Sequence, residues 1–437
     1  MKILMLTPYL PYPPSSGGQV RSYNLIKNLA KRHEITLFSL IKYDEERDFI
    51  PKLEVFCKKV CVFKRSEKPW TLGNILRTGF GSYPFLVVRN LSAEEKRAVA
   101  KELKESAFDL IHAETFYVMP HIPPTKVPIL LVEQTIEYRV YQHYARTCRF
   151  LPFRPLLFVD ILKLRIWESR FWKKATKVVA VSEADKKEMR RIVPSLDVGI
   201  VPNGAGEDLA MLWGKRRPNF NRPIIFYQGN FLWLQNVEAA KILAKEIFPL
   251  IKKEIPEAVC WIVGQGVREK ISNLEGEGIK IRDLATYDIE GVIEAYQKAT
   301  VFVGPLAGPG GTRLKILGAM AAGVPVVTSS VGITGIEAKD GREVLVGDTP
   351  EDLAEAAVCL LKDRKLYTKI ASAARELVNA QYNWEKIAER LDRIYREVSC
   401  KSPLASKMQF ARSGTLTSQS RKEPAIKAGS RDFAREV

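Results

Sequence analysis

The sequence predicts an α/β protein built from two doubly wound parallel-sheet domains that face each other across a central cleft. Short apolar runs typical of buried strands alternate with amphipathic stretches, an order that favours parallel sheets covered by helices. This alternation stops at a polar, basic stretch around residues 203–222 and then begins again. The 437 residues also exceed the size at which a single core usually stops growing.

The first domain is predicted over residues 1–203. An apolar run at 2–6 has the length of a buried strand, and a glycine-containing loop after it leads into a helical pattern near 19–31. The alternation continues with strands at 35–40, 108–112, 128–132, 177–181 and 198–201 and helices at 93–106 and 183–192. Ligands of such sheets bind beyond the carboxyl ends of the strands, which would face the cleft.

The second domain is predicted over residues 204–382, with strands at 222–228, 258–264 and 300–304 and from 325, and helices at 236–253, at 288–298 and after 311. A closing helix is predicted at 383–400, where Trp384, Ile387, Leu391 and Ile394 recur at helical spacing. Residues 401–437 have no apolar period and are rich in Ser, Lys, Arg and Ala, which predicts a disordered basic tail.

The net charge of +18 is unevenly distributed along the chain. Residues 1–200 carry 34 Lys and Arg against 21 Asp and Glu, residues 201–400 carry 26 of each, and residues 401–437 carry 8 against 3. We therefore expect an acidic partner to meet the first half. No nucleic-acid-binding motif accompanies this charge, so nucleic acid is not an expected partner.

The composition is that of a folded chain, with a hydrophobic content of 46%. There is no run of 18 or more apolar residues, and the N-terminus lacks the order of a signal peptide, so we expect a cytosolic protein without a spanning helix. The six cysteines are scattered, and the closest two, Cys57 and Cys61, have no histidine nearby. They are expected to be reduced and structural, and no metal site is predicted.

Two glycine-rich loops precede predicted helices and are candidate anion sites. In the first, SSGGQVR, Gly17 and Gly18 lie well beyond the strand and do not form the G-x-G-x-x-G fingerprint, which argues against a nicotinamide cofactor. Adjacent glycines let a ligand approach backbone amides closely. A loop that is merely flexible is the alternative.

The second loop, GPGGTRLK at 308–315, combines more features that favour an anion. Gly310 and Gly311 expose backbone amides, the start of a helix adds its dipole, and Arg313 and Lys315 add positive charge. A diphosphate is the most natural ligand for this combination. A purely structural turn is the alternative.

Together, these motifs resemble those of the retaining glycosyltransferases of family 4, whose GT-B fold consists of two facing Rossmann-like domains. The family's order of motifs is found in MKILMLTPYLPYPPSSGGQVR, VVAVSEADKKEM, VPNGAGED, FYQGNFLWLQNVEAA, the stretch from Pro305 through TRLKIL and AMAAG to PVV, and YNWEKIAERLDRIYREV. The similarity covers nearly all of residues 1–400. These motifs are specific in combination, and none of them is specific alone.

The resemblance implies transfer of a sugar from a nucleotide-diphosphate sugar, held by the second domain, to a saccharide or lipid-linked saccharide held mainly by the first. Anomeric configuration would be retained, and neither a cofactor nor a metal would be required. Fixed dipoles and cations suit the charge that develops on a leaving nucleoside diphosphate. Carried over residue by residue, the donor site would comprise Gly17, Gly18, Gly229, Asn230, Gly310, Gly311, Thr312, Arg313, Leu314, Lys315 and Gly318.

The chain departs from the family's pattern at four positions in or near this donor site. Gly310 and Gly318 stand where the family usually has two glutamates, the second of which typically bonds the ribose. Asn230 and Gln235 stand where many members have an arginine and a lysine that hold the phosphates. We expect the two cations of the 308–315 loop to supply the missing charge. A glycine within a helix also costs about 1 kcal/mol relative to alanine.

The strand-end sequence FDLIHAETF resembles the family's H-x-H motif, with His112 at the first histidine and Glu114 at the second. The resemblance implies that either group orients a donor hydroxyl or the acceptor, so both are candidate catalytic residues. A buried, structural His112 is the alternative. Glu133 and Glu137 are lower-ranked candidates for the cleft, with solvated helix charges as the favoured alternative.

Residues 144–177 combine aromatic and aliphatic side chains with nine basic residues and only Asp160 and Glu168 as acids. This composition fits an interfacial surface that binds anionic lipid. A core helix with a solvated basic face is the alternative. The positive charge of the whole first half favours the membrane.

We therefore predict a cytosolic glycosyltransferase, peripheral at the inner face of the membrane, that extends a polysaccharide or a glycolipid. Two alternatives stay open. One is a catalytically inactive GT-B protein that binds a saccharide or a partner enzyme, for which the two missing glutamates argue. The other is a nucleotide-sugar epimerase, which would turn over donor without any acceptor.

Overall fold

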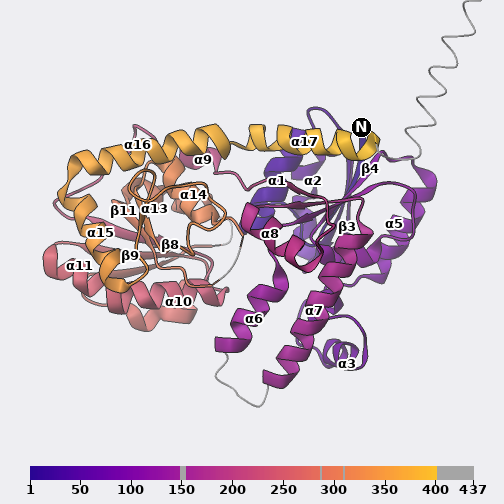
Figure 1. Ribbon diagram of the computed structural model, residues 1–437, viewed down its shortest axis with the longest axis horizontal. Coiled ribbons are helices and arrows are strands. Elements are labelled where there is room, and N and C mark those ends of the chain that lie inside the picture. Colours follow the sequence, from indigo (N-terminus) through magenta and orange to yellow (C-terminus); the bar gives the residue numbers. More distant parts are fainter. Residues whose placement is uncertain (148–153, 286–287, 309–310, 401–437) are drawn as a thin grey trace, which may run out of the picture.

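The computed structural model describes residues 1–147, 154–285, 288–308 and 311–400, and two parallel β-sheets form its framework (Figure 1). The first sheet lies in the indigo-to-magenta part of the chain and the second in the pink-to-orange part, with helices packed around both. The α/β class and the two-sheet architecture predicted from the sequence are confirmed. The predicted tail at 401–437 lies outside the described residues.

The first sheet has seven parallel strands in the order β3-β2-β1-β4-β5-β6-β7. Every residue of β4 and β5 is buried, because helices cover both faces of the sheet. The strands are β1 Lys2–Thr7, β2 Glu34–Ile41, β3 Lys59–Lys64, β4 Leu110–Glu114, β5 Ile129–Glu133, β6 Lys177–Ala180 and β7 Val198–Ile200. The helices are α1 Gly17–Leu29, η1 Asp44–Phe49, α2 Ile50–Glu54, α3 Leu72–Phe80, α4 Phe85–Val88, α5 Ala93–Glu105, η2 Phe116–His121, α6 Glu137–Thr147, α7 Arg154–Lys174 and α8 Glu183–Ile192.

The second sheet has six strands in the order β10-β9-β8-β11-β12-β13, and all of its pairings are parallel. The strands are β8 Ile224–Gln228, β9 Val259–Gly264, β10 Ile279–Asp283, β11 Val301–Gly304, β12 Val326–Thr328 and β13 Leu345–Val346. The helices are α9 Glu207–Ala210, α10 Leu234–Ile242, η4 Leu243–Ile247, α11 Phe248–Glu254, α12 Val267–Ile271, η5 Ser272–Leu274, α13 Ile289–Lys298, α14 Leu314–Ala322, α15 Pro350–Lys362 and α16 Arg364–Gln381.

Three strands were not predicted, namely β3, β10 and β13, and each of them is an edge strand. An edge strand is partly exposed, so charged residues interrupt its apolar pattern; β3 begins with Lys59 and ends with Lys64. The helix predicted at 236–253 is divided by the π-helical turn η4 between α10 and α11. Hydrophobic periodicity identified this segment but did not resolve its change of helical pitch.

The closing helix α17 (Trp384–Cys400) follows the second sheet in sequence but packs on the first domain (Figure 1). Trp384, Ile387 and Leu391 are buried in one cluster with residues of β1. Ile394, the fourth residue of the predicted apolar pattern, is only partly buried against the same cluster. Helix α17 also packs against α1. The amphipathic pattern therefore predicted the helix correctly, but the surface that it covers belongs to the distant N-terminal part of the chain.

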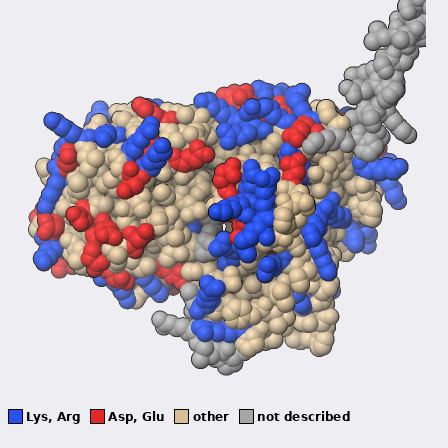
Figure 2. Space-filling view, viewed as in Figure 1, with Lys and Arg blue, Asp and Glu red and all other residues tan. Residues whose placement is uncertain are grey.

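Acidic residues are most visible on the second-domain side of the molecule, while Lys and Arg predominate over much of the first (Figure 2). This agrees with the uneven charge along the sequence. No described helix is long and apolar enough to span a bilayer. The cysteines within the described ranges, Cys57, Cys61, Cys260, Cys359 and Cys400, are free thiols.

Candidate active site

A cavity of about 610 Å³ lies between the two sheets, within the size range of small-molecule sites, which is roughly 300–1,000 Å³. Its lining comes from loops at the carboxyl ends of strands, as expected for doubly wound sheets. Tyr9, Thr115 and Gln134 follow β1, β4 and β5 of the first sheet, and Gly229 and Gln265 follow β8 and β9 of the second. The cleft predicted from the sequence is therefore present.

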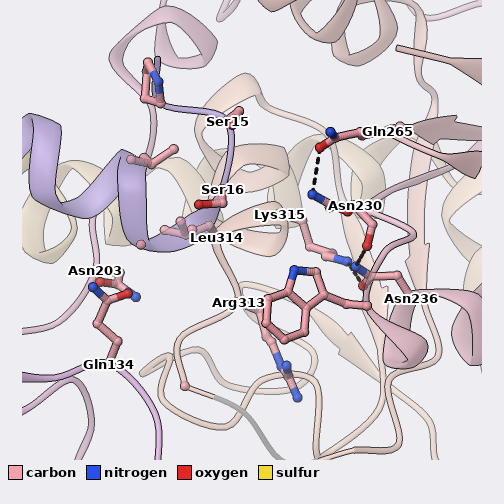
Figure 3. Close-up of a pocket in the computed structure, with 18 of the residues that line it drawn as sticks. Ser15, Ser16, Gln134, Asn203, Asn230, Asn236, Gln265, Arg313, Leu314 and Lys315 are labelled. Carbon is pink, nitrogen blue, oxygen red and sulfur yellow. Dashed lines mark hydrogen bonds between the residues drawn. The ribbon is translucent and has the colours of Figure 1, made fainter. Parts of the chain in front are cut away.

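The structure brings most of the predicted donor residues together at this cavity. Lining positions among them are Gly17, Gly18, Gly229, Asn230, Gly311, Thr312, Arg313, Leu314, Lys315 and Gly318. Gly310 lies outside the described residues. Figure 3 shows Lys315, Asn230 and Asn236 close together, with Gln134 and Asn203 on the opposite side.

Helix α1 presents its N-terminus to the cavity, where Ser16 caps it. A Cβ atom on Gly18 would lie 1.7 Å from the Tyr9 hydroxyl oxygen, so this close approach requires glycine. A Cβ atom on Gly17 would lie 3.4 Å from Cδ1 of Leu314, the first residue of α14. The N-termini of α1 and α14 therefore meet at the cavity, and both dipoles favour an anion there.

The start of α14 adds side chains whose hydrogen-bonding capacity is incompletely used. The Thr312 hydroxyl is buried and has no hydrogen-bond partner within the described residues, and the same holds for Arg313 Nε. The Arg313 guanidinium donates to the Gly308 carbonyl oxygen. Buried donors without partners cost free energy, so a bound anion would stabilise this arrangement.

Lys315 is the second cation of this site and is held by neutral groups. Its Nζ donates to the Tyr227 hydroxyl at 3.1 Å and to Asn236 Oδ1 at 2.5 Å. Burial, and then the nearby positive charge of Arg313, lower the pKa of Lys315 to about 7. Both causes disfavour the charged amine, so a bound diphosphate would raise this pKa again.

His112 and Glu114, the predicted catalytic residues, do not line the cavity. Both are fully buried, and His112 Nε2 lies 2.6 Å from Glu114 Oε2 while its Nδ1 lies 2.5 Å from the Tyr395 hydroxyl of α17. Because neither side chain is accessible, the expectation that they touch donor or acceptor is corrected. The buried alternative for His112 describes what the structure shows.

Glu114 nevertheless connects to cleft residues through a buried polar network. Its Oε1 accepts a hydrogen bond from Gln134 Nε2 at 2.7 Å and ion-pairs with Arg21 Nε at 3.3 Å. Arg21 in turn donates to Asn203 Oδ1 at 2.8 Å. Burial opposes ionisation of Glu114, but His112 and Arg21 outweigh it and lower its pKa. Glu114 thus positions two amides, Gln134 and Asn203, that line the cavity.

The two lower-ranked glutamates differ in position. Glu133 is fully buried at the end of β5, where its carboxylate accepts hydrogen bonds from Trp172 Nε1 at 2.9 Å and from the Phe116 amide at 3.4 Å. Glu137, the first residue of α6, lines the cavity, and burial raises its pKa to about 7 despite the positive charge of Arg89. Neither is the solvated helix charge that the sequence favoured.

Gly318 has a packing role that the sequence does not reveal. A Cβ atom there would lie 2.8 Å from Leu209 Cδ1 and 3.4 Å from the Tyr296 hydroxyl oxygen. The glycine lets Leu209 of α9 approach the interior of α14, and both positions line the cavity. This contact supplies a physical reason for a residue that lowers intrinsic helix stability.

Sequence reasoning missed several lining residues of the first domain, including Arg65, Arg89 and Thr115. Thr115 has φ of 72°, which is strained for a β-branched residue and is a feature found at functional sites. Arg65 directly follows β3, so recognition of that edge strand would have placed it at a carboxyl end. No local signal identified Arg89.

Comparison with known proteins matches each half of the chain to glycosyltransferases. Residues 222–363 match the family model described as glycosyl transferases group 1, and residues 15–208 match the model of glycosyltransferase family 4. The match at 222–363 covers all six strands of the second sheet, and the match at 15–208 covers the first sheet from β2 to β7. The order of the two matches is that of the two domains.

Individual relatives cover the chain to different extents. A phosphatidyl-myo-inositol mannosyltransferase of Mycobacterium leprae is 32% identical over 154 residues, which are 34% of this chain and only 40% of the relative. An uncharacterized 44.6 kDa protein in the cps region of Klebsiella pneumoniae is 21% identical over 402 residues, covering 88% of this chain and 97% of the relative.

Solved structures support the same fold. The sucrose-phosphate synthase of Thermosynechococcus elongatus has a TM-score of 0.67 at 17% identity, covering 91% of this chain and 98% of its own. HepE of Anabaena in complex with UDP and glucose has a TM-score of 0.60 at 15% identity. The match covers 91% of this chain and 100% of the HepE chain. With a family model matched on each sheet and a shared cavity between them, the chain belongs to the family 4 glycosyltransferases and has the GT-B fold.

Proposed function

We propose that this protein transfers a sugar from a nucleotide-diphosphate sugar to a saccharide or lipid-linked saccharide, with retention of anomeric configuration. The observation that carries the proposal is the meeting of two helix N-termini, Arg313 and Lys315 at one cavity between the two sheets. Amides, dipoles and cations in this arrangement suit a diphosphate leaving group. Retention rests on the family to which the chain belongs.

In this proposal the donor lies mainly against the second domain. The diphosphate binds at the Thr312 hydroxyl, the start of α14 and the two cations. The nucleoside lies beside Gln265, Ile289 and Val292, which line the same cavity. The structure of Anabaena HepE in complex with UDP-glucose shares the fold, with a TM-score of 0.58, and is consistent with this class of donor.

We further propose that no metal takes part in the transfer. In metal-dependent sites a divalent cation neutralises the charge on a departing diphosphate. Here Arg313 supplies a positive charge at the start of α14, and Lys315 supplies a second one once the bound diphosphate raises its pKa. Addition of a chelator is therefore expected to leave the transfer rate unchanged.

The experiment that tests the function is calorimetric titration of the protein with UDP-, GDP- and ADP-sugars, followed by a transfer assay with the donor that binds. A Gly318→Glu variant is titrated in parallel, since Leu209 Cδ1 is the flexible end of a side chain and can move aside for the new carboxylate. Binding by the parent supports the proposal. Donor turnover without acceptor would instead indicate an epimerase.

The inactive alternative is favoured by one observation, the absence of a carboxylate at Gly318. It predicts that the parent binds no nucleotide sugar while Gly318→Glu binds one. Binding by neither protein would contradict both the transferase proposal and the assignment of the α14 loop as a phosphate site.

We also propose that the first domain contacts an anionic membrane surface at the cytoplasmic face. Helix α7 exposes Leu156, Phe158, Val159 and Leu162, although other residues of the same helix, including Leu164 and Trp172, are buried. The lobe that carries α3 and the outer part of α7 is mostly uncharged, with Lys and Arg beside it (Figure 2).

Helix α3 extends this surface beyond the predicted segment 144–177. Its Leu72 and Phe80 are 72% and 91% exposed, and the preceding Trp70 is 70% exposed. Lys163 of α7 donates to the Gly81 carbonyl oxygen at 2.8 Å, which ties α7 to the end of α3. Residues 148–153 of the predicted segment lie outside the described residues. Exposed aromatic and aliphatic groups next to basic ones fit an interfacial membrane contact.

A further inference from the structure

Two arginines of the first domain line the cavity on the side opposite the α14 loop. Arg65 follows β3 and Arg89 follows α4, so they come from separate segments that the fold brings to one place. Both side chains are half-buried. They are distinct from Arg313 and Lys315, which belong to the second domain and to the proposed diphosphate site.

The charges of these arginines are poorly compensated. Neither arginine makes an ion pair with any described residue, and the Nε atom of each is buried without a hydrogen-bond partner. Within the described ranges, Arg65 Nη1 donates to the neutral Asn90 Oδ1, at 3.0 Å, and to no carboxylate. Burial, and then the like charge of Arg89, lower the pKa of Arg65. Two guanidinium groups that line one cavity, repel each other and lack an ion-pair partner in the described part of the chain favour the presence of an anion.

The carboxyl groups that act on them do not satisfy them. Glu46 favours the charged form of Arg65, but its Oε1 accepts hydrogen bonds from the Lys42 and Tyr43 amides and it makes no ion pair with Arg65 among the described residues. Glu137 lines the same cavity, but it makes no ion pair with Arg89, and its pKa of about 7 leaves it partly protonated near neutral pH. The partly ionised Glu137 therefore compensates only part of the positive charge of the arginines. Thr115 and Tyr117 complete this part of the lining with hydroxyl groups.

We infer that Arg65 and Arg89 form a subsite for an anionic group, a phosphoryl or a carboxylate, carried by the acceptor. Guanidinium groups bind both classes of oxyanion through paired N–H donors. The location on the first domain places this anion on the acceptor side of the cavity. The inference rests on the proposed function, and it narrows the acceptor to an acidic saccharide or a phosphate-linked one.

The test is titration of the UDP-saturated protein with phenyl phosphate and with methyl glucuronide, using calorimetry. The parent is compared with Arg65→Gln and Arg89→Gln, and with Arg97→Gln on the exposed face of α5 as a control of equal charge change. We expect each subsite variant to bind the preferred probe at least tenfold more weakly and the control to bind as the parent does. The probe that binds distinguishes a phosphoryl from a carboxylate acceptor.

Two further variants sharpen the result. Glu137→Gln is expected to tighten binding of the same probe, because it removes the competing carboxylate. Arg89→Lys keeps the charge but loses the paired donors, so it is expected to bind with intermediate affinity, and it replaces Arg89→Gln if that variant does not fold. Equal probe affinity in the parent and the arginine variants, or no binding of either probe to the parent, would overturn the inference.

Failure of the proposed function is recognised separately. UDP-sugar binding is measured on the same samples and is expected to be unchanged by Arg65→Gln. If the parent binds no nucleotide, the probes are titrated without UDP. The difference in probe affinity between the parent and the arginine variants then tests the anion subsite independently of the proposed function. Weaker UDP-sugar binding in Arg65→Gln, with unchanged probe binding, would assign the arginines to the donor and overturn the inference.

Discussion

The two halves of the cavity are built in different ways. In the proposed donor half, the residues assigned to the diphosphate lie mainly in one segment, from Gly311 to Gly318, at the start of α14. The proposed acceptor half consists of single residues such as Arg65, Arg89 and Asn203, each in a different loop. A helix N-terminus creates a binding site locally, whereas the acceptor half depends on tertiary packing. The donor half is therefore expected to tolerate changes in the first domain's core, and the acceptor half is not.

The largest expected effect comes from breaking the network behind the acceptor half. Glu114→Gln removes the charge that pairs with buried Arg21, so the free energy of unfolding should fall by about 3–5 kcal/mol. Denaturant titration at neutral pH measures this, with Glu54→Gln on an exposed position as control. A loss no larger than that of the control would show that the network does not hold the first domain together.

The donor half should respond to loss of a single cation. Arg313→Ala removes charge-assisted hydrogen bonds, each worth about 1.5–3 kcal/mol, so nucleotide-sugar affinity should fall roughly 10- to 100-fold. Calorimetry compares this variant with Arg222→Ala, an exposed position of the same domain. If donor affinity is unchanged in Arg313→Ala, this arginine does not replace the missing phosphate-binding residues.

The pH dependence of donor binding should report on Lys315, which lies in the donor half of the cavity. Lys315 has a pKa of about 7 in the free protein, and a bound diphosphate raises it, so binding takes up a proton above pH 7. Nucleotide-sugar affinity should be constant below pH 7 and fall by up to tenfold per pH unit above it, until the raised pKa is reached. The profile of Lys315→Met should be flat over the same range, and a parallel slope in both proteins would exclude Lys315 as the cause.

The smallest expected effect concerns the proposed membrane contact, whose exposed apolar residues lie in the first domain. Phe80→Ser removes an exposed apolar side chain from α3, so binding to vesicles that contain anionic lipid should weaken about fivefold. Val55→Ser, another exposed apolar position of the same domain, serves as the control in vesicle sedimentation. Equal weakening in both variants would place the contact elsewhere.

The sequence by itself determined the alternation of strands and helices, the two sheets and the donor loop, because these follow from local periodicity and from contiguous glycines and cations. It missed β3, β10 and β13, because edge strands carry charged residues in place of a clean apolar pattern. The sequence also predicted His112 and Glu114 as catalytic residues, although both are buried. The spacing of two residues on a strand does not indicate whether they are buried.

Only the tertiary structure decided which residues share a site. Helix α17 returns to the first domain and hydrogen-bonds His112 through Tyr395, a contact between residues 283 positions apart. The absence of a side chain at Gly318 leaves room for Leu209 of α9. Arg65 and Arg89 line one cavity because the fold brings two separate loops together. Burial and charge compensation depend on what surrounds a side chain in three dimensions, so residues distant in sequence determine them.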